Sequence, residues 1–405
     1  MKIDVQSLDT FNKLAHEGAE EATRSMTQMT GIEATVEVTK ISLVDREDLG
    51  EEFGRETEFV GVQFGFEGAL TGKTVLIFER ERSSEIVEAL VPGGNADESM
   101  AQSSVEEIGN IMMSGFIDGW AEYLGTTIDH SPPTYIERTG KDILPGSPDT
   151  NERDQVFVFS SEIQWEGENV SFYIYMVPEY EPLTKLMSEH RDEEADAIPV
   201  EKLAAFNQMT REGTQRAAEN VEMMSGIETE AEVSQISFAP IEDVPKQFGE
   251  ETYVGTAVEF TGIPSGFLLV LFDEQSAITV AEGLMPMEME SSELTDKHKA
   301  AIEELGNIMT SGFVDGWANV LQRSVEHTPP RLVHDMGQAI LDPLAAQLGQ
   351  HQRHAFMIDS KMKTEDLEFE SKIHALPNEQ ELRETLDDLD LDRADQTEAN
   401  VDQLF

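Results

Sequence analysis

The sequence predicts an α+β fold made of tandem two-layer α/β modules, each a β-sheet covered by long helices. The clearest evidence is a helix-like stretch that occurs twice, at 106–124 and 303–321, with fourteen of nineteen positions identical. Matching segments that begin at Phe11 and Phe206 each change from helical to alternating spacing of apolar residues. The offset of 195 residues between those two phenylalanines gives each copy the length of an ordinary domain.

The boundaries follow from the repeat and from the charge pattern. We expect a first domain at 1–190 and a second at 203–384. Residues 191–202 are acidic and contain Pro199, which is typical of a solvated linker. Residues 385–405 are rich in Asp and Glu, and we expect them to form a disordered acidic tail.

The elements of each copy follow one another in the same order. The first helix ends at a glycine, Gly31 or Gly226, which favours a helix stop. A half-buried strand and a hairpin come next, since apolar residues alternate and a Gly-containing turn separates two apolar runs. We place the strands near 34–41 and 231–236, and the hairpins at 61–78 and 255–272.

A short helix then precedes the repeated helix, and a Pro-Pro turn and further strands follow it. We expect the short helices near 86–90 and 278–284. The turns follow His130 and His327, which we interpret as turn residues. The later strands are predicted at 156–159, 170–176, 355–358 and 369–376.

The charge is strongly negative: 81 Asp and Glu against 28 Lys and Arg, a net charge of −53. Salt would screen the resulting repulsion, so the composition is typical of a protein that works at high salt, as in halophilic archaea. The sequence contains no basic cluster that could meet phosphates. Nucleic acid and membrane insertion are therefore not expected.

Composition also excludes several kinds of chemistry. The chain has no cysteine, so disulfides and thiolate catalysis are excluded. No apolar run is long enough for a signal peptide or a membrane span, and we expect a cytoplasmic protein. His351 and His354 have no evident third ligand, so no metal site is predicted.

The repeated helix carries one polar face. Ser103, Glu107, Asn110 and Ser114 follow one another at spacings of four, three and four, which places them on the same side of a helix. Asn is unfavourable within a helix by roughly 0.5 kcal/mol relative to Ala. Its recurrence in both copies beside the same Glu therefore needs an explanation.

The other faces of this helix are apolar or lack side chains. We predict that an apolar stripe packs on the sheet; its members are Val105, Ile108, Met112 and Phe116. Gly115 and Gly119 would allow another backbone to approach closely along one edge.

Two interpretations of the Glu and Asn remain open from the residues alone. Both copies could simply have kept a solvated polar face from a common ancestor. Alternatively, the carboxylate and the amide form a rigid polar fork for a partner. An amide donates and accepts at once, so it can orient a water molecule for hydrolysis of a phosphoryl group.

The spacing resembles that of the CheC/CheX/FliY family of chemotaxis phosphatases. Their motif is Asp or Ser, three residues, Glu, two residues, Asn, about twenty-two residues, then Pro. The first copy has Ser103, Glu107, Asn110 and Pro133. The second has Glu304, Asn307 and Pro330 at the same spacing, but Ala300 in place of the leading Asp or Ser. Nearly the whole chain thus resembles two fused CheC-like domains of a haloarchaeal type.

The resemblance implies a mechanism. Asn110 and Asn307 would align the attacking water in the active site of phosphorylated CheY, and Glu107 and Glu304 would contact a CheY lysine. CheY would supply the aspartyl phosphate and Mg²⁺, so no cofactor of the chain's own is expected. CheC domains often carry a second Glu-x-x-Asn on the first helix. Neither first helix has one here, so we expect both to be structural.

Two functions from different classes remain. The first is an aspartyl-phosphate phosphatase acting on CheY-P, which the two amides favour. The second is a non-catalytic CheC-like adaptor that binds CheY, CheD or a motor component. Because a hydroxyl at Ser103 could hold the Glu107 carboxylate and Ala300 cannot do so for Glu304, we expect the first site to be the more active.

Overall fold

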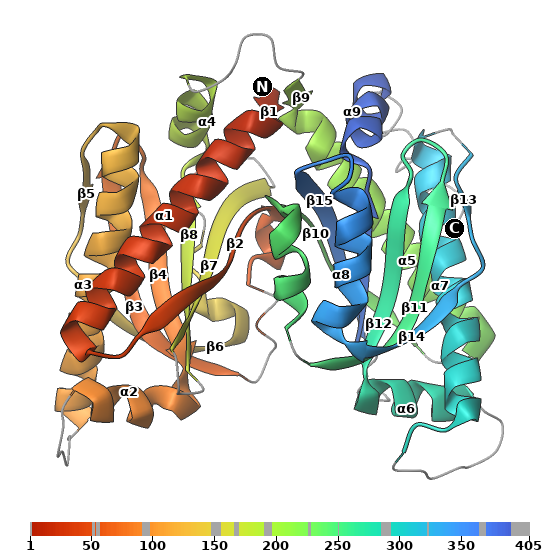
Figure 1. Ribbon diagram of the computed structural model, residues 1–405, viewed down its shortest axis with the longest axis horizontal. Helices are drawn as coiled ribbons and strands as arrows, with labels where there is room; N and C mark the ends of the chain where they lie inside the picture. The colour runs from red at the N-terminus through yellow and green to blue at the C-terminus, as the bar shows by residue number, and fades with distance from the viewer. Residues whose placement is uncertain are drawn as a thin grey trace. The chain divides into compact units, whose positions relative to one another are not determined.

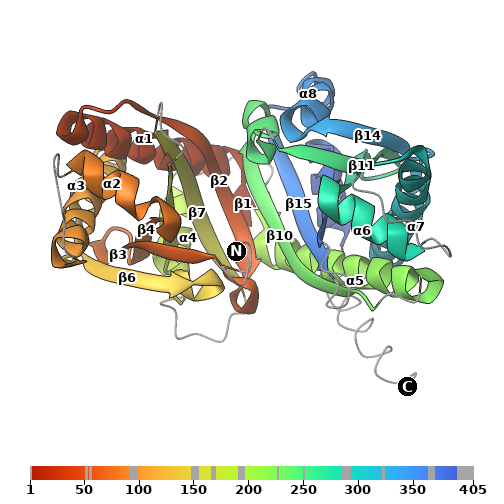
Figure 2. The same ribbon diagram turned by 90° about the horizontal axis from the view of Figure 1, so that it is seen from below.

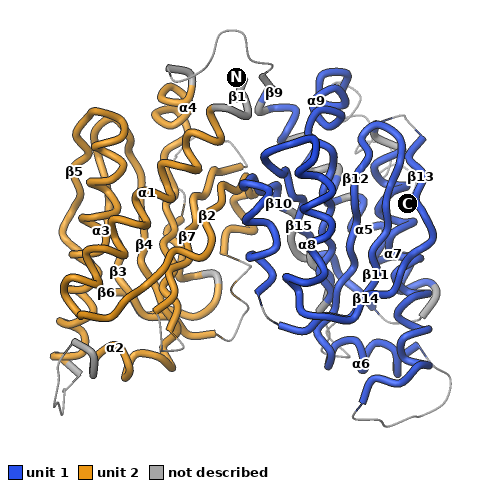
Figure 3. The backbone as a smooth tube through the Cα atoms, viewed as in Figure 1, with its two compact units in different colours: residues 1, 198–405 blue, residues 2–197 orange. Residues whose placement is uncertain are grey.

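The computed structural model describes residues 2–50, 53, 57–90, 98–146, 155–165, 170–189, 197–225, 228–249, 251–284, 293–321, 324–363 and 370–389. These residues form two compact units that divide between Ala197 and Ile198 (Figure 3). We call them module 1 (2–197) and module 2 (198–389); the short strand at 197–199 crosses the division and is described with module 2.

Module 1 alternates long helices with antiparallel strands (Figure 1). Its elements are β1 (Lys2–Asp4), α1 (Val5–Thr30), β2 (Ala34–Asp45), η1 (Arg46–Asp48), β3 (Glu58–Gly68), β4 (Gly72–Glu79), η3 (Arg80–Arg82), α2 (Ser83–Leu90), α3 (Glu98–Leu124), β5 (Ile128–His130), β6 (Thr134–Thr139), η4 (Gly140–Ile143), β7 (Gln155–Trp165), β8 (Ser171–Pro178) and α4 (Tyr180–Glu189).

Module 2 repeats this order of α-helices and strands, except that α8 stands where module 1 has the short η4; the other 3-10 helices also differ. Its elements are β9 (Ala197–Pro199), α5 (Val200–Ser225), β10 (Glu230–Pro240), η5 (Ile241–Asp243), η6 (Pro245–Phe248), β11 (Thr252–Thr261), β12 (Gly266–Asp273), α6 (Glu274–Leu284), α7 (Asp296–Leu321), β13 (Glu326–His327), β14 (Arg331–Met336), α8 (Gly337–Leu348), β15 (His354–Lys363), β16 (Glu370–Pro377) and α9 (Glu379–Asp388).

Each module has one antiparallel sheet with the same strand order. In module 1 the order is β2-β7-β8-β4-β3, and β5 and β6 both pair with the outer edge of β3. In module 2 it is β10-β15-β16-β12-β11, with β13 and β14 on β11. The short strands β5 and β13 therefore bring the residues before each Pro-Pro turn to a sheet edge.

Two long helices cover one face of each sheet (Figure 2). A buried tryptophan from the second long helix lies at the centre of each helix–sheet interface. Trp120 contacts Phe11 of α1 and Phe159 of β7, and Trp317 contacts Phe206 of α5 and Phe260 of β11. Burying rings of this size supplies much of the hydrophobic stabilisation.

The other face of the sheet is covered differently in the two modules. In module 2, α8 packs on it with Ile340, Leu341 and Leu344 against Leu269 and Leu271. In module 1 a smaller cover that includes Ile143 and Leu144 buries the equivalent face.

Glycines allow the two long helices of each module to approach closely. A Cβ added at Gly119 would lie 3.0 Å from the Cα of Gly18, and one at Gly316 would lie 2.4 Å from the Cα of Gly213. A Cβ at Gly115 would lie 3.0 Å from the backbone oxygen of Glu21. The expectation of a close backbone approach at Gly115 and Gly119 is therefore confirmed.

The α+β fold with a helix-covered sheet in each copy is confirmed, and so is the stop of the first helix. Gly31 has a φ of 74°, and its N–H donates to the Thr27 carbonyl. Gly226 lies outside the described residues.

Two boundaries differ from the expected ones. Residues 197–199 form β9 and α5 begins at Val200, where we expected linker; residues 191–196 lie outside the described part. The expected tail begins within α9, which continues to Asp388 because Leu386 is buried and keeps the helix packed. Residues 390–405 are not among those described.

Candidate functional site

The polar face predicted on the repeated helix lies at the surface of α3. Ser103 and Glu107 are exposed, and Asn110 and Ser114 are half-buried. The predicted apolar stripe faces the sheet; Val105, Ile108, Met112 and Phe116 are all buried. The chemistry-bearing side chains therefore lie on the side of α3 that a partner can reach.

The polar face of α3 and the Pro-Pro turn line one pocket. Ser103, Glu106, Glu107 and Asn110 of α3 line one wall, and His130, Ser131, Pro132 and Pro133 line the other. Residues that are more than twenty positions apart in sequence thus meet at one place. The position of Pro133 in the motif has a structural meaning, since its loop forms the wall opposite the amide.

Four pocket residues were not assigned to a site by sequence reasoning: Glu106, His130, Ser131 and Pro132. The signal for the last three was the recurrence of His-Ser-Pro-Pro as His-Thr-Pro-Pro in the second copy. His130 is the last residue of β5 and lines the pocket, so its interpretation as a turn residue was wrong.

The His130 ring connects α3 to the Pro-Pro loop. Its Nδ1 lies 3.1 Å from the carbonyl oxygen of Ser131, and its Nε2 lies 3.2 Å from Oγ of Ser114. Because a carbonyl oxygen only accepts, Nδ1 carries a proton and donates it. The single hydroxyl hydrogen of Ser114 can be donated either to the carbonyl oxygen of Asn110, 2.7 Å away, or to His130 Nε2.

The loop itself is held against the sheet. The Gly65 N–H of β3 donates to Ser131 Oγ at 2.9 Å, and the Ser131 N–H donates to the Gly65 carbonyl at 2.8 Å. Since β3 is a paired strand of the sheet, these bonds hold the wall of the pocket in a fixed position.

Module 2 repeats these contacts. Glu304 is exposed and Asn307 and Pro330 are half-buried. The Nε2 of His327 lies 3.4 Å from Ser311 Oγ, and its Nδ1 lies 2.9 Å from the Thr328 carbonyl oxygen. The Glu259 N–H of β11 donates to Thr328 Oγ1 at 3.0 Å, as Gly65 does to Ser131. The two modules thus hold the same motif by the same bonds.

Ser103 does not make the contact that we expected from the sequence. No hydrogen bond joins it to Glu107, although both side chains belong to the described part of the chain. Its neighbours bond elsewhere: Gln102 to Glu106, and Ser104 to the Met100 carbonyl. Ser103 is exposed, so water can satisfy its hydroxyl.

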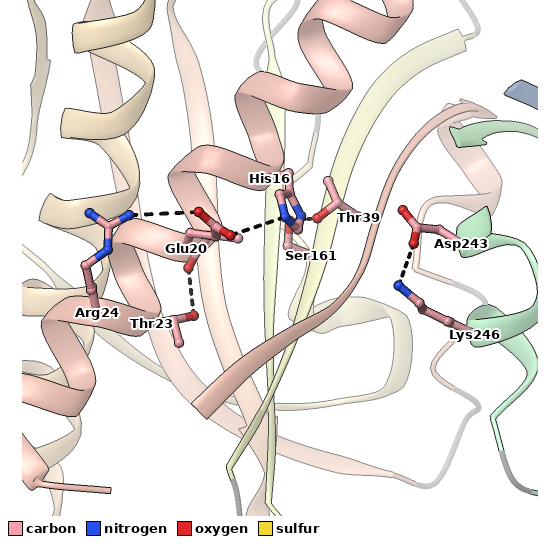
Figure 4. A network of polar contacts seen from close by, with 9 residues as sticks. His16, Glu20, Thr23, Arg24, Thr39, Ser161, Asp243 and Lys246 are labelled. Carbon is pink, nitrogen blue, oxygen red and sulfur yellow. Dashed lines mark hydrogen bonds and ion pairs between the residues drawn. The ribbon is translucent and has the colours of Figure 1, made fainter. Parts of the chain in front are cut away.

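The first helix of each module lies apart from this chemistry. Asn12 of α1 is buried and donates to the Thr39 carbonyl at 3.3 Å, and Asn207 of α5 is buried as well. The outer side of α1 carries ion pairs between residues one turn apart: Glu20 contacts His16 and Arg24 at 3.6 and 3.9 Å (Figure 4). Such exposed pairs contribute little to stability.

Within the described residues, no three His, Asp or Glu side chains gather as a possible metal site. His354 begins β15, and its ring stacks on Phe238 at 5.1 Å. Among the helices described, none is long and apolar enough to cross a membrane.

Comparison with known proteins agrees with this geometry. The CheC-like family model matches residues 100–137 and 298–334, the helix-and-loop segments of both modules. A Halobacterium salinarum protein named "Putative CheY-P phosphatase CheC1" is 36% identical over 190 residues, which are 97% of its length and 46% of this chain. That match has about the length of one module.

Two solved structures also show similarity to this chain. Thermotoga maritima FliY shares 22% identity over 47% of this chain and 97% of its own, with a TM-score of 0.37. A chemotaxis protein CheX from Desulfovibrio desulfuricans shares 13% identity over 41% of this chain and 99% of its own, with a TM-score of 0.32.

Proposed function

Because this chain belongs to the CheC-like family of chemotaxis proteins, we propose that it dephosphorylates phosphorylated CheY at two sites, one on α3 and one on α7. The observation that carries the proposal is the repeated geometry. In each module a Glu and an Asn lie on the reachable side of a long helix, beside a loop that the same hydrogen bonds hold. Reuse of one arrangement in two modules favours a function over a solvated face.

The proposed role of Asn110 and Asn307 is to orient water. The amide oxygen accepts a hydrogen bond from the water and the amide N–H₂ donates to it, so the water is held in one orientation. Placed in line with the phosphoryl group of CheY, the water attacks phosphorus. The bond from phosphorus to the aspartyl oxygen breaks, which releases inorganic phosphate and the free carboxylate. Positioning of this kind is the main contribution a protein makes to phosphoryl transfer.

Glu107 and Glu304 have a proposed role in binding. Each lies one helical turn before its Asn and is exposed. A carboxylate at this place can accept a hydrogen bond from a lysine beside the phosphoryl group. The bond would fix the depth at which the helix enters the CheY active site. The Mg²⁺ that balances the phosphoryl charge would come with CheY, as part of the substrate.

Decay of labelled CheY-P tests the proposal. Purified CheY is phosphorylated on its aspartate, and loss of label is followed in high salt with and without this protein. We expect substoichiometric protein to accelerate the loss, with release of inorganic phosphate. If the protein binds CheY-P and leaves its decay rate unchanged, it is an adaptor and the proposed activity is wrong.

A further inference from the structure

The two sites share their reactive residues but differ in what surrounds them. On α3, Met100 lies seven residues before Glu107, and on α7 Lys297 lies seven residues before Glu304. Seven residues are two helical turns, so each lies on the same face as the Glu, roughly 10 Å from it along the helix axis. Met100 is 46% exposed, and Lys297 is exposed as well. An apolar side chain two turns before Glu107 thus corresponds to a cation two turns before Glu304.

The residue that follows each Pro-Pro turn shows a change in the same direction. Thr134 follows Pro133 and begins β6, whereas Arg331 follows Pro330 and begins β14. Both side chains are exposed. Arg331 has no ion pair with any residue in the described ranges. The second module therefore has one cation on the helix and one at the start of β14, at positions where the first module has none.

Lys297 and Arg331 belong to residue types that are rare in this chain. Only 28 of 405 residues are Lys or Arg, and α3 contains none. α7 carries Lys297 and Lys299 in its first turns. Two such changes beside the same motif indicate that the surroundings of the second site differ in what they recognise.

We propose that the second site docks a phosphorylated receiver domain that presents carboxylates opposite Lys297 and Arg331, and that the first site docks one with an apolar surface opposite Met100. The inference rests on the proposed function and extends it, because it assigns each site its own kind of CheY surface. Direct contact is required. At molar salt the Debye length is about 3 Å, so a charge acts only on a group that it touches.

The test measures binding to each site separately. Glu107→Ala/Asn110→Ala disables the first site and leaves the second, and Glu304→Ala/Asn307→Ala does the reverse. The probe is CheY held in its phosphorylated form by beryllofluoride, with affinity measured in 1 M KCl and in 3 M KCl. Lys297→Met/Arg331→Thr then gives the second site the residues of the first.

We test a CheY that the unmodified second site binds more tightly than the first site does. For this CheY, we expect Lys297→Met/Arg331→Thr to weaken binding at the second site by about three- to tenfold, the effect of losing two exposed ion pairs. Lys297→Arg/Arg331→Lys keeps both charges and should keep the affinity. Lys246→Met is the matched control, since it removes one exposed cation from η6, where Lys246 pairs with Asp243 at 2.7 Å. It should leave binding unchanged.

The reciprocal change is Met100→Lys/Thr134→Arg at the first site. We expect it to strengthen binding of that same CheY at the first site. Unchanged affinity after Lys297→Met/Arg331→Thr, or an equal loss after Lys246→Met, overturns the inference and leaves the proposed function intact. If CheY-P binds neither site of the unmodified protein, both fail together.

Discussion

The hydroxyl of Ser114 lies 3.2 Å from Nε2 of His130, and this contact joins the helical turn after Asn110 to the loop that carries Pro133. The equivalent distance between Ser311 and His327 is 3.4 Å. Neither the serine nor the histidine belongs to the Glu-x-x-Asn motif, yet their contact recurs in both modules. This recurrence indicates that the spacing between helix and loop is itself part of the site.

We therefore expect His130→Ala to lower kcat at the first site, measured with Asn307→Ala to silence the second. Losing one hydrogen bond of about 0.5–1.5 kcal/mol corresponds to about two- to tenfold in rate if the bond matters only in the reacting complex. KM should change less than kcat, since the surface that meets CheY is retained. His130→Gln keeps a donor and an acceptor and should recover part of the rate.

His16→Ala is the control, because His16 is a partly exposed histidine on α1. A fall in kcat of the same size for His16→Ala would show that His130 has no special role in positioning.

Ser103 provides a second prediction. Since it makes no hydrogen bond to Glu107, Ser103→Ala should change the rate at the first site by less than about twofold. Ala300→Ser should likewise change the rate at the second site by less than about twofold. A clear loss for Ser103→Ala would instead support the sequence-based expectation that this hydroxyl makes the first site the more active one.

The close approach of α5 and α7 predicts a large effect on stability. Gly316→Ala would place a methyl group 2.4 Å from the Cα of Gly213, so the helices must separate. Overpacking of this kind costs about 1–3 kcal/mol in the free energy of unfolding. Denaturant unfolding at constant salt measures it. Gly146→Ala is the matched control, because a Cβ there meets nothing within 4 Å; equal effects of the two substitutions would refute the packing argument.

Glu162 predicts a pH dependence of stability. Burial raises the pKa of this carboxyl above its ordinary value of 4.5, and the nearby charge of Glu37 raises it further, against a hydrogen bond from Ser171 that lowers it. The folded state thus binds the proton more tightly than the unfolded state does. Its stabilising contribution is present below the unfolded pKa and is lost as the pH rises through the raised folded pKa.

Glu162→Gln should therefore stabilise the protein at neutral pH relative to wild type and have little effect in acid. Unfolding curves at both pH values measure the difference. An exposed carboxyl such as Glu33 serves as the control, and the same gain from Glu33→Gln would show only relief of overall negative charge.

Most of the fold could be predicted because an element predicted in one copy was also predicted at the matching place in the other. Spacing of apolar residues predicted α3 and α7, and the glycines predicted where α1 ends. α8 was missed, since the first copy has only the short η4 at that place and Pro343 lies inside α8. Sequence placed Glu107 and Asn110 on one face because that depends on helix geometry alone. It did not place His130 beside Ser114, because this contact depends on how β5 pairs with β3.

Our main proposal is that the amides of Asn110 and Asn307 orient the attacking water. The most direct measurement is the rate of CheY-P dephosphorylation by the Asn110→Ala/Asn307→Ala variant, beside its affinity for beryllofluoride-activated CheY. We expect the rate to fall to that of CheY-P alone while folding and most of the affinity remain, since both side chains are half-buried and neither belongs to the core. Hydrolysis of CheY-P by this variant at the wild-type rate would contradict it.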